Sequence, residues 1–158
     1  MSLEVMKRSA SDNKYLHRDF HLFMNRGLLY LEKNYGEGHV KEYLTRFSRA
    51  FYAPLKDDLK KNGLSAIKTH YEKIFETEEC PDALSCFLSK AEDELVIKMA
   101  YSPAIKHIRK SGEIPAENYF EVEKAVNEEL VSGLPYKFEL RKYNSADGCA
   151  ELYFKEVK

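Results

Sequence analysis

The sequence has 158 residues, of which 44% are hydrophobic and 32% charged, and its 25 basic and 26 acidic side chains leave a formal net charge of −1. This composition excludes a disordered chain, which would have fewer apolar residues and a large net charge. The balanced charge offers no field for nucleic acid or an anionic membrane, and no apolar run approaches the roughly 20 residues of a spanning helix. We therefore expect one domain over residues 1–158 and, because the N-terminus lacks the apolar core of a signal peptide, a cytoplasmic location.

Four amphipathic helices are predicted in the first half of the chain, over residues 12–34, 37–51, 54–62 and 65–76. Each has apolar residues at spacings of three and four, which is the period of one helix face. Asp12 and Ser65 are plausible N-caps and Gly36 a plausible stop. Phe23 and Gly27 lie on the first apolar stripe, where the glycine indicates close approach of another backbone or simply an ordinary helical glycine.

The second half changes to a period of two and predicts two β-hairpins separated by two helices. The expected strands cover residues 84–89, 95–101, 136–141 and 150–154, and the expected helices cover 103–111 and 117–132. Helices and strands are segregated along the chain, which favours an α+β fold. We expect a helical N-terminal half and two C-terminal helices packed on an antiparallel sheet of about four strands, made of the two hairpins.

Metal and cofactor motifs are weak in this sequence. Three cysteines (Cys80, Cys86 and Cys149) are odd in number and irregularly spaced, which is typical of reduced thiols rather than of a disulfide framework or a zinc site. His17 and His21 have the i, i+4 spacing of metal ligands on one helix face, but the residues between them offer no clear third ligand. Without a glycine-rich phosphate loop, we predict no metal and no cofactor.

Residues 100–154 resemble the L-2-amino-thiazoline-4-carboxylic acid hydrolase family. The resemblance rests on Ser102 to Lys110 (SPAIKHIRK), Phe120-Glu121, Val126-Asn127-Glu128, Tyr136 to Glu139 and Gly148-Cys149 with Phe154. It implies hydrolytic opening of a small ring that contains sulfur and nitrogen, on the route from that acid to cysteine. The family's pattern has cysteine at the positions of Ser102 and Phe120 and histidine at the position of Val122, whereas Glu121 and Cys149 are kept.

Two residues of this stretch are candidates for catalysis. Cys149 opens the last strand, on the face opposite Ala150 and Leu152, and is a candidate nucleophile if a cation such as Arg141 or Lys142 lowers the pKa of its thiol. The alternative is a half-buried thiol in a hairpin. Glu121 is a candidate general base, and the alternative is a solvated carboxylate in the first turn of a helix, where the helix dipole favours it.

Three further residues are candidates for substrate binding. Asn127 would hold a carboxylate or carbonyl group, or would make a structural hydrogen bond, since asparagine in mid-helix calls for some tertiary reason. His107 would exchange a proton near neutral pH, and Arg109 would pair with an anionic substrate. The alternative for His107 and Arg109 is a basic helix C-terminus that matches the helix dipole.

The resulting hypothesis is a hydrolase of a small cyclic C–N or C–S compound, with a pocket between the last two helices and the sheet. The alternative is a non-catalytic small-ligand-binding or sensor domain on the same fold, suggested by Ser102, Phe120 and Val122 in place of the family's cysteines and histidine. A third hypothesis is a partner-binding module that uses an exposed sheet face. We expect a small-molecule ligand and neither nucleic acid nor a membrane as partner, and a homo-oligomer stays open.

Overall fold

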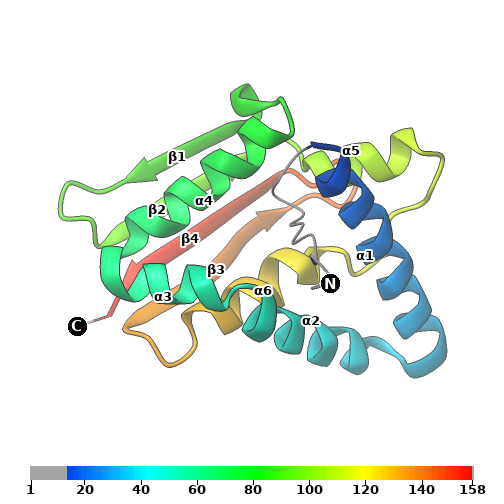
Figure 1. The fold of residues 1–158 in the computed structure, drawn as a ribbon, viewed down its shortest axis with the longest axis horizontal. Helices are drawn as coiled ribbons and strands as arrows, with labels where there is room; N and C mark the ends of the chain where they lie inside the picture. Colours follow the sequence, from blue (N-terminus) through cyan, green and yellow to red (C-terminus); the bar gives the residue numbers. More distant parts are fainter. Residues whose placement is uncertain (1–13, 158) are drawn as a thin grey trace, which may run out of the picture.

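A computed structural model describes residues 14–157 and confirms the α+β class (Figure 1). The four N-terminal helices are α1 (Lys14–Tyr35), α2 (Glu37–Phe51), α3 (Ala53–Asn62) and α4 (Leu64–Thr77). A hairpin of β1 (Leu84–Leu88) and β2 (Glu94–Met99) follows, and then α5 (Pro103–Lys110) and α6 (Phe120–Val131). The described chain ends with the hairpin of β3 (Tyr136–Tyr143) and β4 (Ala150–Glu156).

The two hairpins join into one antiparallel sheet with the strand order β1-β2-β4-β3. The join is the pairing of β2 with β4, in which Leu95 lies opposite Phe154 and Ile97 opposite Leu152. These four side chains have no exposed surface, so the join is also the centre of the core under the sheet. Burying each of them contributes roughly 1.5–3 kcal/mol, which explains why this register is favoured over a slip by one residue.

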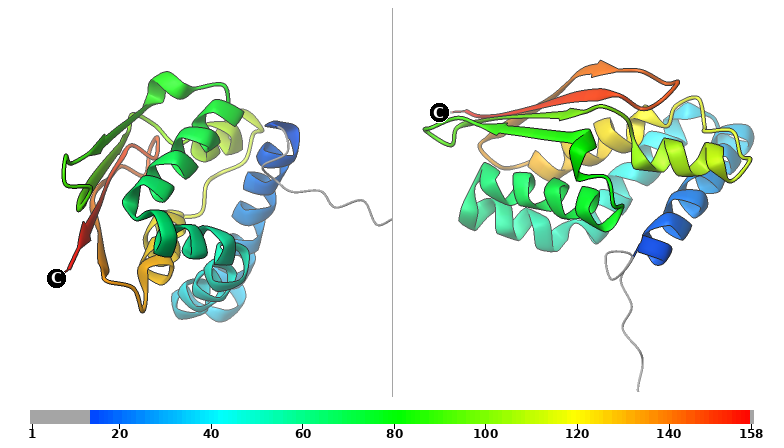
Figure 2. Two further views of the ribbon diagram at one scale, coloured as in Figure 1. Left: turned by 60° about the vertical axis from the view of Figure 1, so that its left-hand side comes forward. Right: turned by 90° about the horizontal axis from the view of Figure 1, so that it is seen from above.

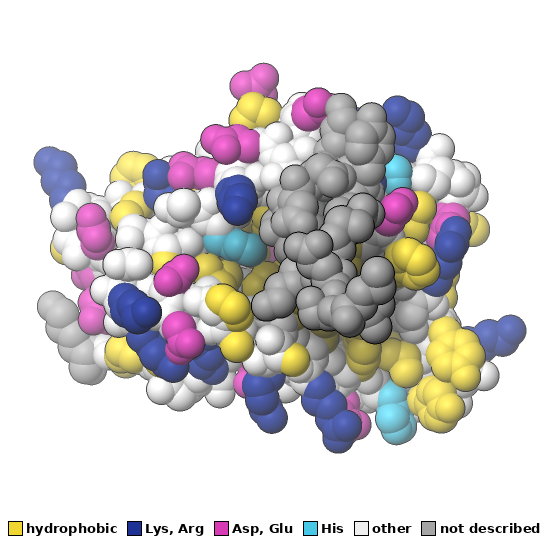
Figure 3. Space-filling view, viewed as in Figure 1, with side chains coloured by type: hydrophobic (Ala, Val, Ile, Leu, Met, Phe, Trp, Pro, Cys, Tyr) yellow, Lys and Arg dark blue, Asp and Glu magenta, His cyan; other side chains and the backbone are white. Residues whose placement is uncertain are grey.

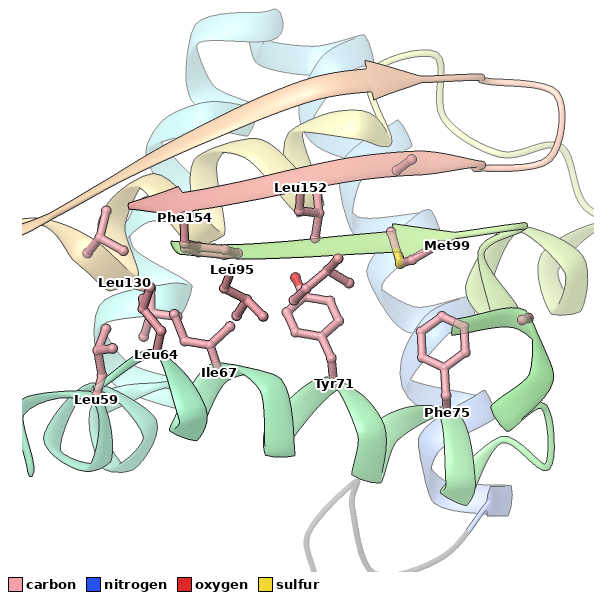
Figure 4. Close-up of a cluster of buried hydrophobic side chains, with 14 residues drawn as sticks. Leu59, Leu64, Ile67, Tyr71, Phe75, Leu95, Met99, Leu130, Leu152 and Phe154 are labelled. Carbon is pink, nitrogen blue, oxygen red and sulfur yellow. The ribbon is translucent and has the colours of Figure 1, made fainter. Parts of the chain in front are cut away.

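All the helices lie on one side of the sheet, as the two views of Figure 2 show. Ile67, Tyr71 and Phe75 rise from α4 toward the strands and meet their inner face (Figure 4). The outer face carries charged side chains instead, with an ion pair of 3.6 Å between Lys98 and Glu151. The outer face therefore mixes charged side chains with the exposed ring of Phe87, and the partner-binding hypothesis stays a prediction.

A second buried cluster holds α1, α2, α5 and α6 together, away from the sheet. Its members include Met24, Leu28, Leu44 and Ile108, each less than 5% exposed. Two cores thus lie side by side, one under the sheet and one among the helices. Their junction lies beside α6, which supplies Leu130 and Val131 to the first core and Ala125 and Val126 to the second.

Two buried polar residues fix α6 and the segment before it. Asn25 of α1 is fully buried, and its side chain accepts a hydrogen bond from the Ala116 amide (2.9 Å) and donates one to the Ile114 carbonyl (3.0 Å). The hydroxyl of Ser48 on α2 donates to the Val126 carbonyl at 2.8 Å. Because buried polar groups are costly when left unpaired, these bonds select one position of α6 against the helices.

Several local predictions for the helical half are wrong. Phe23 is 70% exposed, and a methyl group added at Gly27 would meet nothing within 4 Å, so no backbone packs there. Gly63, not Ser65, is the N-cap of α4, and the Ser65 hydroxyl donates to the Asn62 carbonyl instead. Asp12 lies outside the described residues.

Acidic and basic side chains are interspersed over the face shown in Figure 3, with a hydrophobic group at the corner where α1 meets α2. Tyr30 and Tyr35 are more than half exposed at this corner. Among residues 14–157, no helix combines the length and the apolar character that crossing a bilayer requires.

Candidate functional site

A cavity of about 100 Å³ lies at the junction of the two cores. Its walls come from α1, α3, α4, β2, α5 and α6 and the segments next to them, and apolar side chains make up most of its lining. Its polar side chains lie on α1, α4 and α6 or just before α3, α5 and α6: His17, His21, Tyr52, His70, Tyr71, Ser102, Tyr119, Glu123 and Asn127. An apolar cavity with a few convergent polar groups is the usual form of a small-molecule site.

Glu123 is the acidic side chain of this cavity. The Tyr71 hydroxyl donates to its Oε2 at 3.2 Å, and the Asn127 amide donates both to the Tyr71 oxygen (2.9 Å) and to the Glu123 carbonyl (2.7 Å). Burial raises the pKa of Glu123 to about 6, against the hydrogen bond from Tyr71, which acts to lower it. A carboxyl group with this pKa exchanges its proton close to neutral pH, as an acid–base catalyst requires.

The tyrosines around Glu123 stay protonated over a wide pH range. Burial raises the pKa values of Tyr52, Tyr71 and Tyr119, and the nearby charge of Glu123 raises each of them further. Tyr71 is therefore a hydrogen-bond donor to Glu123 and not a base. Because the Nδ2 group of Asn127 already donates hydrogen bonds to Tyr71 and Glu123, its Oδ1 is the atom that can accept a hydrogen bond from a ligand.

A second group of polar residues borders the cavity at α1. The i, i+4 spacing places His17 and His21 on one side of the helix, with ring centroids 4.6 Å apart. Glu78, the C-cap of α4, reaches both of them: its Oε1 lies 2.6 Å from His17 Nδ1 and 2.9 Å from His21 Nε2. Arg18 donates from its Nε to the other oxygen, Oε2, at 3.1 Å. The structure thus supplies the third ligand-type side chain that the local sequence around the histidines lacks.

Burial governs the protonation of this group, together with its hydrogen bonds. Burial lowers the pKa of His21, and the hydrogen bond to Glu78 offsets this only in part. Burial acts to raise the pKa of Glu78, but hydrogen bonds from His17, His21 and Arg18 outweigh it and hold that pKa far below its ordinary value. Glu78 is therefore a carboxylate at every ordinary pH.

The structure does not bring the five residues predicted from the sequence into one site. Asn127 lines the cavity and is 3% exposed. The hydrogen bond to Tyr71 is the tertiary contact that accounts for an asparagine in the middle of this helix. His107 borders a separate groove of about 430 Å³ on the far side of Glu78, and Arg109 is exposed on α5.

Glu121 and Cys149 lie outside the cavity lining. Glu121 is half-buried in the first turn of α6, and its Oε2 is buried without a hydrogen-bond partner among the described residues. Cys149 is a half-buried free thiol before β4. Arg141, one of the two cations expected beside it, stacks on the Tyr153 ring, 3.5 Å from the ring centroid.

Sequence reasoning missed Glu123, Tyr71 and Glu78. For Glu123 a signal exists, since it occupies the apolar stripe of α6 between Tyr119 and Val126 at spacings of four and three. A carboxylate in that stripe has to be buried and therefore has to have a partner or a task. Glu78 has no such signal, because it follows His21 by 57 residues.

No protein-family model matches this chain, and none of the curated proteins matches it either. The resemblance to the thiazoline-carboxylate hydrolase family therefore stays a hypothesis, and the cavity is the feature of the structure that bears on function.

Proposed function

We propose that this protein binds a small nitrogen-containing ring compound in the cavity and hydrolyses it, with Glu123 as the general acid–base group. The observation that carries the proposal is the environment of Glu123: a carboxyl group in a largely apolar cavity, with its pKa raised to about 6 and its orientation fixed by Tyr71. Glu123 takes the general-base role that was predicted for Glu121, two residues away on the same helix.

The size of the cavity limits the ligand. Its volume of about 100 Å³ is smaller than the roughly 150 Å³ that accommodates benzene, so the part of the ligand inside the cavity must be smaller than benzene. A five-membered ring meets this limit. A groove of about 570 Å³ shares His17, Tyr52 and His70 with the cavity wall, and it can hold the remainder of a larger ligand.

The charge of the cavity favours a ring that carries an amine or amidine group. An ionised Glu123 accepts hydrogen bonds and attracts a cation, and the Oδ1 of Asn127 is a second acceptor. A cyclic isothiourea, such as a 2-amino-thiazoline, presents N–H donors and a partial positive charge to these acceptors. The chemistry of the site therefore agrees with the substrate class that the sequence resemblance implies.

The hydrolytic step needs only water and the carboxylate. Glu123 takes a proton from a water molecule, whose oxygen forms a bond to the ring carbon between the two heteroatoms. The C=N π pair of the isothiourea moves onto the ring nitrogen, which takes the proton from Glu123. The ring C–N bond then breaks as the new hydroxyl oxygen forms the C=O double bond, and Glu123 carries the hydroxyl proton to the departing nitrogen, which leaves as an amine, so the enzyme ends as it began. A carboxyl group with a pKa near the working pH serves both halves of this cycle, and such catalysis contributes typically 10²–10⁴-fold.

The test compares glutamate-to-glutamine substitutions at three positions of α6. Ring opening of 2-amino-thiazoline-4-carboxylate and related compounds is followed by NMR for the wild type and for E123Q, E121Q and E128Q. Glu128 makes a surface ion pair of 3.5 Å with Lys41 and serves as the matched control. We expect E123Q to lose roughly 100-fold or more in kcat, while E128Q keeps the wild-type rate. Full activity in E123Q, or loss in E121Q alone, would refute the role of Glu123.

Non-catalytic binding is the second candidate function, and the position of Cys149 outside the cavity favours it. A binding or sensor domain needs the cavity but no nucleophile. The same compounds should then raise the melting temperature without being consumed, with about 2.7 kcal/mol of added stability at a ligand concentration of one hundred times Kd. Turnover that depends on Glu123 would exclude this candidate.

A further inference from the structure

We propose that His17, His21 and Glu78 form a binding site for a divalent first-row transition-metal ion at the α1 side of the cavity. The inference is independent of the proposed hydrolysis, because it concerns an ion that the three side chains bind whether or not a substrate is turned over.

The geometry of the three ligand atoms fits a metal ion. Around tetrahedral zinc, bonds of about 2.0–2.2 Å place neighbouring ligand atoms roughly 3.3 Å apart. Here the Glu78 oxygen is 2.6 Å and 2.9 Å from the two histidine nitrogens, and all three atoms lie within 4.8 Å of one another. Movements of an ångström or less in side chains would place an ion at bonding distance from all three.

The residue types also match. Two imidazoles and one carboxylate are the ligand set of many catalytic zinc sites and of non-haem iron sites, and both types leave coordination positions open. The three side chains are at most 12% exposed, so an ion would replace the buried hydrogen bonds with stronger ones. Arg18 holds Oε2 of Glu78 at 3.1 Å, which leaves Oε1 aimed at the histidines, as an outer partner of a metal-binding carboxylate does.

The position of the group gives the ion access to a ligand. His17 and His21 both line the cavity, whereas Glu78 and Arg18 line the groove behind it. An ion between them would direct its remaining positions toward the cavity, where water or an anionic ligand group could bind. The cavity would then have Glu123 near α6 and a cation near α1, which suits a ligand with a basic head and an acidic tail.

The alternative is a clamp in which two histidine N–H groups simply donate to Glu78, and a metal titration separates the two. The full chain is prepared without a histidine tag, stripped with a chelator and titrated with Zn²⁺ and with Co²⁺. We expect one ion per chain and visible d–d absorption from bound Co²⁺. In H21Q and E78Q we expect affinity to fall by a factor of ten or more, while H70Q, which changes another histidine of the cavity wall, keeps wild-type affinity.

Circular dichroism shows first whether each variant is folded. The titration of the wild type decides the question even if a variant does not fold. No stoichiometric Zn²⁺ or Co²⁺ binding by the wild type would overturn the proposal and establish the clamp. Unchanged affinity in folded H21Q and E78Q would overturn it as well, because the ion would then bind elsewhere. Loss of ring-opening activity has no bearing on either result.

Discussion

The raised pKa of Glu123 predicts a specific dependence of stability on pH. In the unfolded chain this carboxyl group ionises at about its ordinary pKa of 4.5, but in the folded protein it holds its proton to about 6. The folded state therefore binds more protons than the unfolded state between these values, and folding becomes less favourable as pH rises through them. E123Q removes the titration and keeps an oxygen for the Tyr71 hydroxyl to donate to.

The magnitude follows from the two pKa values. They differ by about 1.5, which at about 1.36 kcal/mol per pKa unit corresponds to about 2 kcal/mol. Glu123 imposes no such penalty below pH 4.5, where it is protonated in both states, and the full penalty well above pH 6. The free energy of unfolding of the wild type, minus that of E123Q, should therefore fall by about 2 kcal/mol between pH 4 and pH 7.5.

Urea denaturation at several pH values measures this difference directly, because every other titrating group cancels between the two proteins. E128Q is the control, and its difference from the wild type should change little with pH because Glu128 is paired only at the surface. A difference for E123Q that stays constant with pH, or that rises as pH rises, would show that Glu123 is not desolvated in the cavity. The catalytic proposal would then lose its physical basis.

Two further predictions concern the hairpin turn and the cavity wall. G148A should destabilise the protein by more than about 2 kcal/mol, because Gly148 has φ +71° and an added Cβ would collide with Ser102, whereas G133A at φ +74° meets nothing and should cost about 1 kcal/mol. Equal falls in melting temperature would contradict this. Burial lowers the pKa of His70 to about 4, so the wild type should lose up to about 3 kcal/mol relative to H70Q as pH falls from 6.5 to 4. Parallel denaturation curves at the two pH values would contradict it.

The succession of elements could be predicted from the sequence because its signals are local. The α2 helix begins and ends where the apolar spacing and Gly36 predict. The alternation of inward and outward side chains in β1 is kept even at Phe87, which points outward and is 72% exposed. The errors are also local in origin: the first stripe counted Phe23 as core, but whether a helix face is covered depends on where the other helices lie. Pairing of β2 with β4 joins residues about 55 positions apart, and periodicity carries no information on it.

The candidate site was harder to predict because it is assembled from distant segments. Glu123 comes from α6, whereas Tyr71 and Glu78 come from α4 and its C-cap. The two helices share no motif, and Tyr71 and Glu78 are ordinary in their own stretches of sequence. The resemblance directed attention to residues 100–154, yet of the five residues chosen there only Asn127 lines the cavity. The mid-helix position of asparagine was the signal that pointed to Asn127, which lines the cavity, whereas the signal of a carboxylate inside an apolar stripe was overlooked at Glu123.

The energetics of the junction argue that its polar residues serve a purpose other than stability. Glu123 costs about 2 kcal/mol at neutral pH by the reasoning above, even though the hydrogen bond from Tyr71 already acts to lower its pKa. A leucine at this position would continue the stripe from Tyr119 to Val126 and could fill part of the cavity, so a sequence selected only for stability would not keep a glutamate here. His70 adds a second unfavourable burial on the same wall. Two titratable groups placed at a net cost around one cavity are what a binding or catalytic site requires, and a packing defect would not gather them.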